Sequence, residues 1–330
     1  MHGCAPTQWW RGAVAKARLR PPKQTEGCRH VTKEPALDRA SDHVAGLAER
    51  LLQRADAAGV FPTPLDSVAE VVGIEEVLDI SELPAAVKPR RPSFLRRVVG
   101  ALLYREEVAF IDYGQSQVRA RFTEAHEIAH RAIPWHQASH ELFLDDDRAL
   151  DPETELELEA EANIMAAHLL FQGARFHDRA LSYELSLATP TLLAPQFGTS
   201  MHATIRYYVE HHPESVALAI VGQFATSDDT VPVWNALASP TFIAEHGPFS
   251  RWFPGNRLAI GSGADVRPLG QVAHRALHGE SHPELELRRT ALDGEVRRYK
   301  AEAFYNQRCV FVLVTPRSGL RLGRRVRLAG

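Results

Sequence analysis

The pentapeptide His126-Glu127-Ile128-Ala129-His130 constrains this chain more than any other feature of its sequence. Residues four apart lie one turn apart on the same face of a helix, so both imidazoles can reach one metal ion. Glu127 directly follows the first histidine, which places its carboxylate beside a bound metal rather than on it. There it can take a proton from water, whose pKa a bound metal lowers from about 16 to about 7. The pattern predicts a hydrolytic metal site; the alternative is an amphipathic helix that happens to carry two histidines.

A third ligand can come from two places. His136 stands ten residues after His126, as in metzincins, but those enzymes have glycine at the position of Ile133, where a β-branched residue is strained at positive φ. Glu159 and Asn163 share one face of the next predicted helix, so one could bind the metal while the other supports a metal-bound histidine. The stretch after Glu159 is almost wholly apolar, and a carboxylate at the edge of a buried helix needs a partner such as a cation. Two histidines, a glutamate and a water form an open catalytic zinc arrangement.

The composition narrows the class of protein. The chain has 330 residues, enough for about two domains, and with 45% hydrophobic and 24% charged residues it can bury a sizeable core. A net charge of −3 argues against a nucleic-acid binder over the whole chain. The three cysteines form no CxxC pair, which excludes a thiolate zinc cage. No apolar run approaches the length of a membrane helix or resembles a secretory signal, so we expect a soluble, cytoplasmic protein without a membrane partner.

The pattern along the chain predicts an α+β protein in five segments. Residues 1–37 form a basic, disordered leader, for which an arm that contacts an anionic surface is the alternative. In residues 38–175, strands at 98–104 and 108–112 form a hairpin that leads into a motif helix at 117–132, which Pro134 ends, and a second long helix covers 153–171. Residues 176–213 read as a helix-turn-helix-like helical segment. Residues 214–316 alternate strands with Gly- and Pro-rich turns, as an α+β domain does, and 317–330 are a basic tail.

Two sequence blocks resemble the ImmA/IrrE family of metallopeptidases. Residues 121–130 are similar to its RFTxAHExxH motif, and residues 159–170 to its ExEANxFAxxLL helix. The predicted hairpin, with Gly100, is similar to the usual lead-in. Two positions depart from the pattern, since Met165 replaces a phenylalanine and Phe171-Gln172 replaces Met-Pro. The resemblance covers residues 40–175 and implies a mainly helical, zincin-like metallopeptidase domain with a small β-sheet.

The resemblance also implies roles for single residues. The metal ligands would be His126, His130 and Glu159, with Glu127 as the general base. With Glu159 as the ligand, the shared helix face leaves Asn163 to support a metal-bound histidine. The implied cofactor is Zn2+, with Mn2+ or another divalent cation as alternatives. The layout is similar to the IrrE (PprI) branch, which joins the peptidase to helix-turn-helix-like helices and a GAF-like C-terminal domain. It implies a regulatory endopeptidase whose protein substrate is a helix-turn-helix transcriptional repressor, in a stress, DNA-damage or mobile-element response.

A different class of function competes with this interpretation. The chain could be a DNA-binding or antitoxin-like regulator whose metal site is structural. The predicted helix at 201–210 carries Arg206 but also Glu210, whereas DNA contact needs several cations, so we expect packing or substrate docking rather than direct DNA binding. Replacing Glu127 separates the two classes. A peptidase would lose cleavage but keep its metal, and a structural site would tolerate the change and unfold with a chelator.

Overall fold

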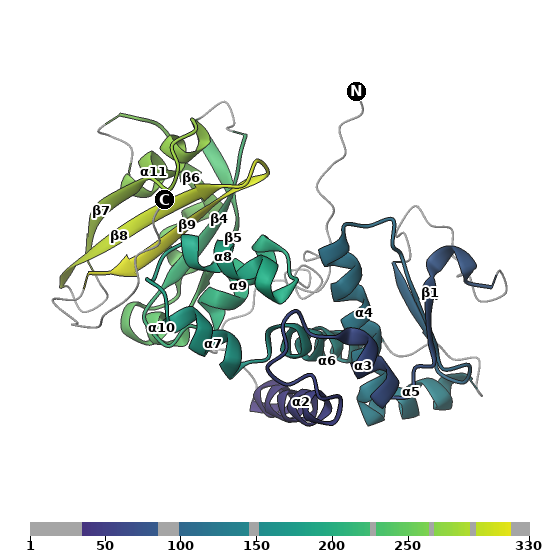
Figure 1. Cartoon of the computed structure of the whole chain (residues 1–330). Coiled ribbons are helices and arrows are strands. Elements are labelled where there is room, and N and C mark those ends of the chain that lie inside the picture. Colours follow the sequence, from purple (N-terminus) through teal and green to yellow (C-terminus); the bar gives the residue numbers. More distant parts are fainter. Residues whose placement is uncertain are drawn as a thin grey trace, which may run out of the picture. The chain divides into compact units, whose positions relative to one another are not determined.

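The chain divides into two compact units, residues 1–173 and 174–330 (Figure 1). A computed structural model describes residues 35–84, 99–144, 152–224, 229–263, 267–290 and 295–317. The predicted leader up to residue 34 and the basic tail beyond 317 lie outside these ranges. The described chain combines helices with a three-stranded and a six-stranded sheet, which confirms the predicted α+β class. None of the helices in these ranges is both long and apolar enough to cross a membrane.

The first unit packs five helices against a small sheet. Its sheet has the order β1-β3-β2, with β1 parallel and β2 antiparallel to the central β3. The elements are α2 (Pro35–Arg54), α3 (Leu65–Val71), β1 (Glu76–Asp79), the short 3-10 helix η1 (Ile80–Glu82), β2 (Gly100–Leu103), β3 (Val108–Ile111), α4 (Gln117–Ala132), α5 (Pro134–Leu144) and α6 (Pro152–Phe171).

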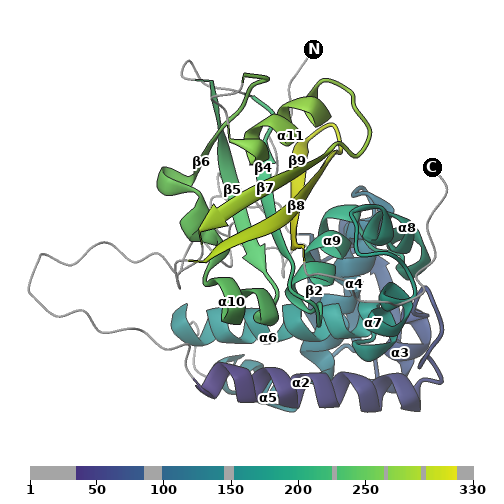
Figure 2. The ribbon, with the colours of Figure 1, turned by 90° about the vertical axis from the view of Figure 1, so that its left-hand side faces the viewer.

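The core of this unit lies among α2, α3, α4 and α6. Helices α2 and α6 run side by side (Figures 1 and 2), and α4 packs on α6. On α4, Ala125, Ile128 and Ala129 are fully buried in this core, and on α6 so are Met165 and Leu169. This packing fixes α4 and α6 relative to each other. Helix α4 carries His126 and His130, and α6 carries Glu159, the three predicted metal ligands.

Gln172 ends α6 and ties it to the loop that follows α2. It has a left-handed backbone with φ 54°. Its buried side-chain amide donates to the backbone oxygens of Ala57 (3.0 Å) and Val60 (3.1 Å) and to the hydroxyl of Thr63 (3.0 Å). Gln172, which stands where the resembling sequences have proline, therefore fixes the end of α6 against the loop after α2.

Two elements of the first unit differ from the sequence expectation. Helix α4 ends at Ala132 as predicted, but Pro134 starts a further helix, α5, instead of a polar loop. Proline suits the first position of a helix, because its missing N–H has no intrahelical partner there. Strand β1 was not predicted, and its four residues are only partly buried.

The second unit is a six-stranded antiparallel sheet with helices on both faces. Its strand order is β6-β5-β4-β9-β8-β7. The helices are α7 (Ala174–Leu181), α8 (Ala188–Phe197), α9 (Met201–Glu210), α10 (Pro240–His246) and α11 (Pro268–Leu277), with the 3-10 helices η2 (Phe249–Trp252) and η3 (Pro254–Asn256). The strands are β4 (Ala217–Gly222), β5 (Thr230–Ala238), β6 (Arg257–Ala259), β7 (Glu284–Thr290), β8 (Val296–Tyr305) and β9 (Cys309–Pro316).

One core fills the face of this sheet beneath α11, α10 and η2. Ala217, Ala219 and Val221 of β4 point into it, together with Val272 of α11 and Phe242 of α10. Successive strand residues alternate between faces, so the remaining residues of β4 point to the other side, where α9 packs on β4 and β5. Both faces of the central strand are thus covered.

Helices α8 and α9 are joined by a short turn, as the helix-turn-helix-like pattern predicts. Gly198 ends α8 in a left-handed conformation with φ 63°. The Ser200 hydroxyl accepts a hydrogen bond from the Ala203 amide at 3.1 Å and caps α9. On α9, Arg206 pairs with Glu210 at 3.0 Å, which neutralises a cation that DNA contact would need.

Candidate metal centre

Helix α4 places two histidines one turn apart, next to the packed core. Its residues Ala125, Ile128 and Ala129 are fully buried, which holds the helix in one orientation. His126 and His130 therefore present their rings along one face, at the side where α6 passes. Glu159 lies on α6 and points back toward both rings.

Three side chains converge at this point. The Nε2 atoms of His126 and His130 lie 3.1 Å apart. One carboxylate oxygen of Glu159 lies 3.4 Å from Nε2 of His126, and the other lies 3.4 Å from Nε2 of His130. One ligand atom from each residue falls within 4.8 Å of the others. The set offers two ring nitrogens and a carboxylate oxygen, the donors that zinc accepts.

Burial and charge give the three groups different protonation behaviour. Burial raises the pKa of Glu159, but hydrogen bonding to His126 and His130 outweighs it and holds the pKa far below its usual range. Burial lowers the pKa of His130 to about 4, which leaves its ring neutral at pH 7. Burial also acts to lower the pKa of His126, but the contact with Glu159 and the charge of Glu127 outweigh it, so its pKa is raised. The carboxylate of Glu159 is thus ionised beside a neutral imidazole.

Glu127 lies beside this group but outside it. Its side chain is buried, and burial raises its pKa to about 7, an effect that the charge of His126 opposes. Gly100 of β2 passes directly over it. A methyl group at Gly100 would lie 2.4 Å from Oε1 of Glu127 and 2.5 Å from Cγ2 of Thr123, so only glycine leaves room for the carboxylate.

His136 contacts the other side of the His130 ring. The two Nδ1 atoms lie 3.0 Å apart, whereas Glu159 approaches His130 at Nε2. Nε2 of His136 lies 3.0 Å from Oε2 of Glu161, and the indole of Trp135 donates to the same oxygen at 2.6 Å. His136 is fully buried. The structure therefore places His136, the alternative third ligand, at Nδ1 of His130, and Glu159 at the Nε2 atoms of both His126 and His130.

Asn163 follows Glu159 by one turn of α6, as predicted. Its side chain lies against the His126 ring and contributes to the raised pKa of that histidine. Within the described residues, however, no group makes a well-aligned hydrogen bond to the buried Nδ1 of His126.

Tyr104 is a site residue that the sequence analysis missed. It follows β2, and its hydroxyl donates to the backbone oxygen of His130 at 3.1 Å. Burial raises the pKa of Tyr104, and the nearby charges of Glu127 and Glu159 raise it further. Nothing in its sequence position signals this contact, because Tyr104 lies in a hairpin turn 26 residues before His130.

Comparison with known proteins finds a family model that matches part of the chain. Residues 96–206 match the family model of the IrrE N-terminal-like domain. Among solved structures, a Mycobacterium tuberculosis transcriptional regulator aligns at 16% identity and a TM-score of 0.48, over 85% of this chain and 78% of that chain. No curated protein matches the sequence. The matched range contains the histidines of α4 and the glutamate of α6.

Proposed function

We propose that this chain, whose residues 96–206 match the family model of the IrrE N-terminal-like domain, is a zinc-dependent endopeptidase. The observation that carries this proposal is the convergence of His126, His130 and Glu159, with the buried carboxylate of Glu127 beside them. A purely structural metal site does not need an additional buried acid next to its ligands. A hydrolase needs one to accept a proton from water.

The side chains fit a catalytic rather than a structural zinc ion. His126 and His130 would hold the ion through Nε2 and Glu159 through its carboxylate, a set of three protein ligands as in catalytic zinc sites. Zinc, when bound, supplies Lewis-acid activation of water and of the substrate carbonyl. Mn2+ or another divalent cation could occupy the same donors.

Glu127 would act as the general base. It follows His126 on α4 and is held in place by β2, so its carboxylate can receive a proton from the attacking water. It would then hold this proton until the peptide bond breaks and deliver it to the departing amine.

His136 and Glu161 would orient His130 for this role. A histidine that binds metal through Nε2 carries its proton on Nδ1, which can donate to Nδ1 of His136 at 3.0 Å. His136 then carries its own proton on Nε2 and donates it to Glu161 at 3.0 Å. Such outer partners fix the tautomer and ring orientation of a ligating histidine. Here His136 lies between the proposed ligand His130 and the carboxylate of Glu161.

The substrate class follows from the resemblance of the two sequence blocks. We propose a regulatory endopeptidase that cleaves a helix-turn-helix transcriptional repressor, in a stress, DNA-damage or mobile-element response. The pairing of Arg206 with Glu210 on α9 supports a protein rather than DNA as the partner.

Metal-dependent cleavage tests this function. Purified protein would be stripped with a chelator and reloaded with zinc or manganese, then incubated with a helix-turn-helix repressor from the same genome. We expect cleavage to disappear on stripping and to return with metal. A chain that binds no zinc after reloading would contradict the proposal, and so would cleavage that persists after complete removal of metal.

A further inference from the structure

One arginine beside the candidate metal centre joins three segments of the first unit. Arg131 follows His130 on α4, and its side chain is only 10% exposed. Its guanidinium has five N–H donors in one rigid plane, so it can bind several acceptors at once. It donates to the backbone oxygens of Val72 (3.1 Å), Gly73 (3.3 Å) and Tyr104 (3.3 Å) and to Oε1 of Glu107 (2.7 Å). Arg131 therefore ties the loop after α3 and the turn between β2 and β3 to α4.

Two further hydrogen bonds close the same connection. The Tyr104 hydroxyl donates to the backbone oxygen of His130 at 3.1 Å, which brings the turn against the last part of α4. The amide of Glu75 donates to the backbone oxygen of Glu107 at 2.8 Å, which joins the turn to the segment before β1. The side chain of Arg131 lies among these segments and contacts both the turn and the loop after α3.

Strand β2 benefits from such a tether because it lies at an edge of its sheet. Among the described strands it pairs only with β3, and all four of its residues are half-buried. A segment with few buried contacts opens locally more readily than a central strand. At its beginning, Gly100 passes over Glu127, and its end leads into Tyr104, which Arg131 holds. Release of that end would let the strand move away from α4.

The arginine and the proposed general base lie on the same side of α4. Glu127 and Arg131 are four residues apart, so they are neighbours on the helix surface. Strand β2 meets α4 at Glu127, and the turn after it meets α4 at Arg131. His126 and His130 each precede one of these residues and face Glu159. The tether thus acts on the side of α4 that holds Glu127.

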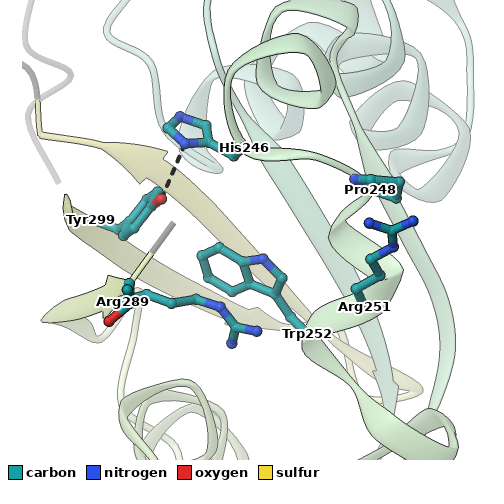
Figure 3. Close-up of a pocket in the computed structure, with 7 residues that line it drawn as sticks. His246, Pro248, Arg251, Trp252, Arg289 and Tyr299 are labelled. Atoms are coloured by element: carbon teal, nitrogen blue, oxygen red, sulfur yellow. Dashed lines mark hydrogen bonds between the residues drawn. The ribbon is translucent and has the colours of Figure 1, made fainter. Parts of the chain in front are cut away.

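The arginines of a recess in the second unit are held differently. The guanidinium carbon of Arg289 lies 4.3 Å from the ring centroid of Trp252, and Arg251 lies on the other side of that residue (Figure 3). Their side chains do not meet at one partner. Arg131 instead brings acceptors from two separate segments onto one guanidinium, so its loss should be felt beyond its own position.

We propose that Arg131 is a positioning residue of the peptidase. It holds the β2–β3 hairpin on α4 and so keeps Gly100 over the carboxylate of Glu127, where that group can take a proton from water. Displacement of a reacting group by about 1 Å can cost roughly 100-fold in rate, so a tether outside the ligand group can matter. This inference rests on the proposed function, in which Glu127 is the general base. Arg131 acts through the strand and not through contact with the substrate.

Cleavage kinetics and hydrogen exchange on the zinc-loaded full chain test this role. We expect Arg131→Ala to bind zinc like wild type but to lower kcat at least about tenfold, with KM changed less than about threefold, because the loss acts on the chemical step. Residues 100–111 should take up deuterium faster than in wild type. Arg131→Lys keeps a cation beside Glu107 but has fewer donors, so it should restore part of the lost kcat.

Arg105→Ala is the matched control. Arg105 lies in the same turn, but it is exposed. Its replacement removes the same kind of side chain without the four hydrogen bonds of Arg131. We expect kcat to change by less than about twofold, as for an exposed charge, and deuterium uptake by residues 100–111 to match wild type. A difference between the two variants therefore does not come from the loss of charge alone.

Two results would overturn the proposal while wild type cleaves its substrate. Wild-type deuterium uptake in Arg131→Ala would show that the hairpin does not need the tether. Faster uptake with unchanged kcat would show that Glu127 does not depend on the hairpin. A zinc-loaded wild type that cleaves nothing would overturn the proposed function, and the role of Arg131 with it. If Arg131→Ala fails to fold, Arg131→Lys carries both measurements.

Discussion

At the scale of single residues, three glutamates of the metal-site region differ because their surroundings differ. Glu159 contacts two histidines and stays ionised, whereas burial raises the pKa of Glu127 and of Glu124 to about 7. Glu124 does not belong to the ligand group, but Asp66 lies close enough to raise its pKa further, against the charge of Arg121. Sequence spacing distinguishes Glu127 from Glu159, whereas the burial of Glu124 near Asp66 depends on how α3 packs on α4 and could not be predicted from it.

Glu124 makes stability depend on pH. Its pKa rises from 4.5 in the unfolded chain to about 7 in the folded one, so the folded chain binds more protons between these values. Its contribution to stability therefore falls as pH rises from about 4.5 to 7. Glu124→Gln should unfold like wild type at pH 4.5 and be more stable at pH 8, by up to about 3 kcal/mol, since one pKa unit is worth about 1.4 kcal/mol. Denaturant unfolding at both pH values measures this. A variant that is equally destabilised at both would show that the carboxylate is needed in its ionised form.

His136 tests the orientation of His130, a proposed metal ligand. His136→Ala removes the acceptor for Nδ1 of His130 without touching Nε2. We expect zinc affinity to fall about 10- to 100-fold, as for other partners of metal-bound histidines. Competition with a chromophoric chelator measures the zinc dissociation constant, and the metal-free thermal midpoint reports on any packing loss. His278→Ala, at an exposed histidine of the second unit, is the control. Unchanged zinc affinity in His136→Ala would remove His136 and Glu161 from the site.

The candidate ligands could be predicted from sequence because helix geometry fixes where residues one turn apart lie. His126 and His130 needed no more than this spacing, and Glu159 needed the apolar stretch behind it. The contacts of His136 and Tyr104 could not be predicted, because each depends on how the segments after α4 and β2 fold back. Local pattern carries no information on such contacts.

At the scale of elements, the contact between β2 and α4 controls the position of Glu127, the proposed general base. Gly100→Ala would place a methyl group 2.4 Å from Oε1 of Glu127 and push the carboxylate away. We expect cleavage to fall at least about tenfold, as for small displacements of catalytic groups, while zinc still binds to its three ligands. Gly46→Ala, where the added carbon meets only the end of Arg50 at 3.5 Å, is the control and should keep full activity. Normal cleavage by Gly100→Ala would mean that Glu127 does not need its observed position.

The elements that the sequence predicted are those with strong local periodicity. The hairpin of β2 and β3 and the helices α4 and α6 lie close to their expected ranges. Helix α4 ends before Pro134, as predicted, but Pro134 also begins α5, because proline suits the first position of a helix as well as the residues after one. Strand β6 has only three residues. Strand β5 contains Pro232, and the register of its pairing with β4 shifts between Ile220 and Val221. Neither strand therefore shows a clear alternating pattern in the sequence.

At the scale of the whole molecule, the two units have separate hydrophobic cores. The proposed ligands all lie in the first unit, where they join α4 to α6. Zinc should therefore stabilise only that unit, by about 2.7 kcal/mol when free zinc is 100 times its dissociation constant. In differential scanning calorimetry we expect two transitions, of which one moves upward with zinc and the other stays. Equal movement of both, or of neither, would contradict the placement of the metal.

The most direct test of the central claim compares wild type with Glu127→Gln. The amide has almost the same shape as the carboxylate but cannot accept a proton, and Glu155→Gln on the exposed side of α6 is the matched control. The measurement combines zinc per chain with cleavage of the repressor. We predict one zinc in each of the three proteins, and cleavage by wild type and Glu155→Gln only. Full cleavage by zinc-loaded Glu127→Gln would contradict the proposed mechanism.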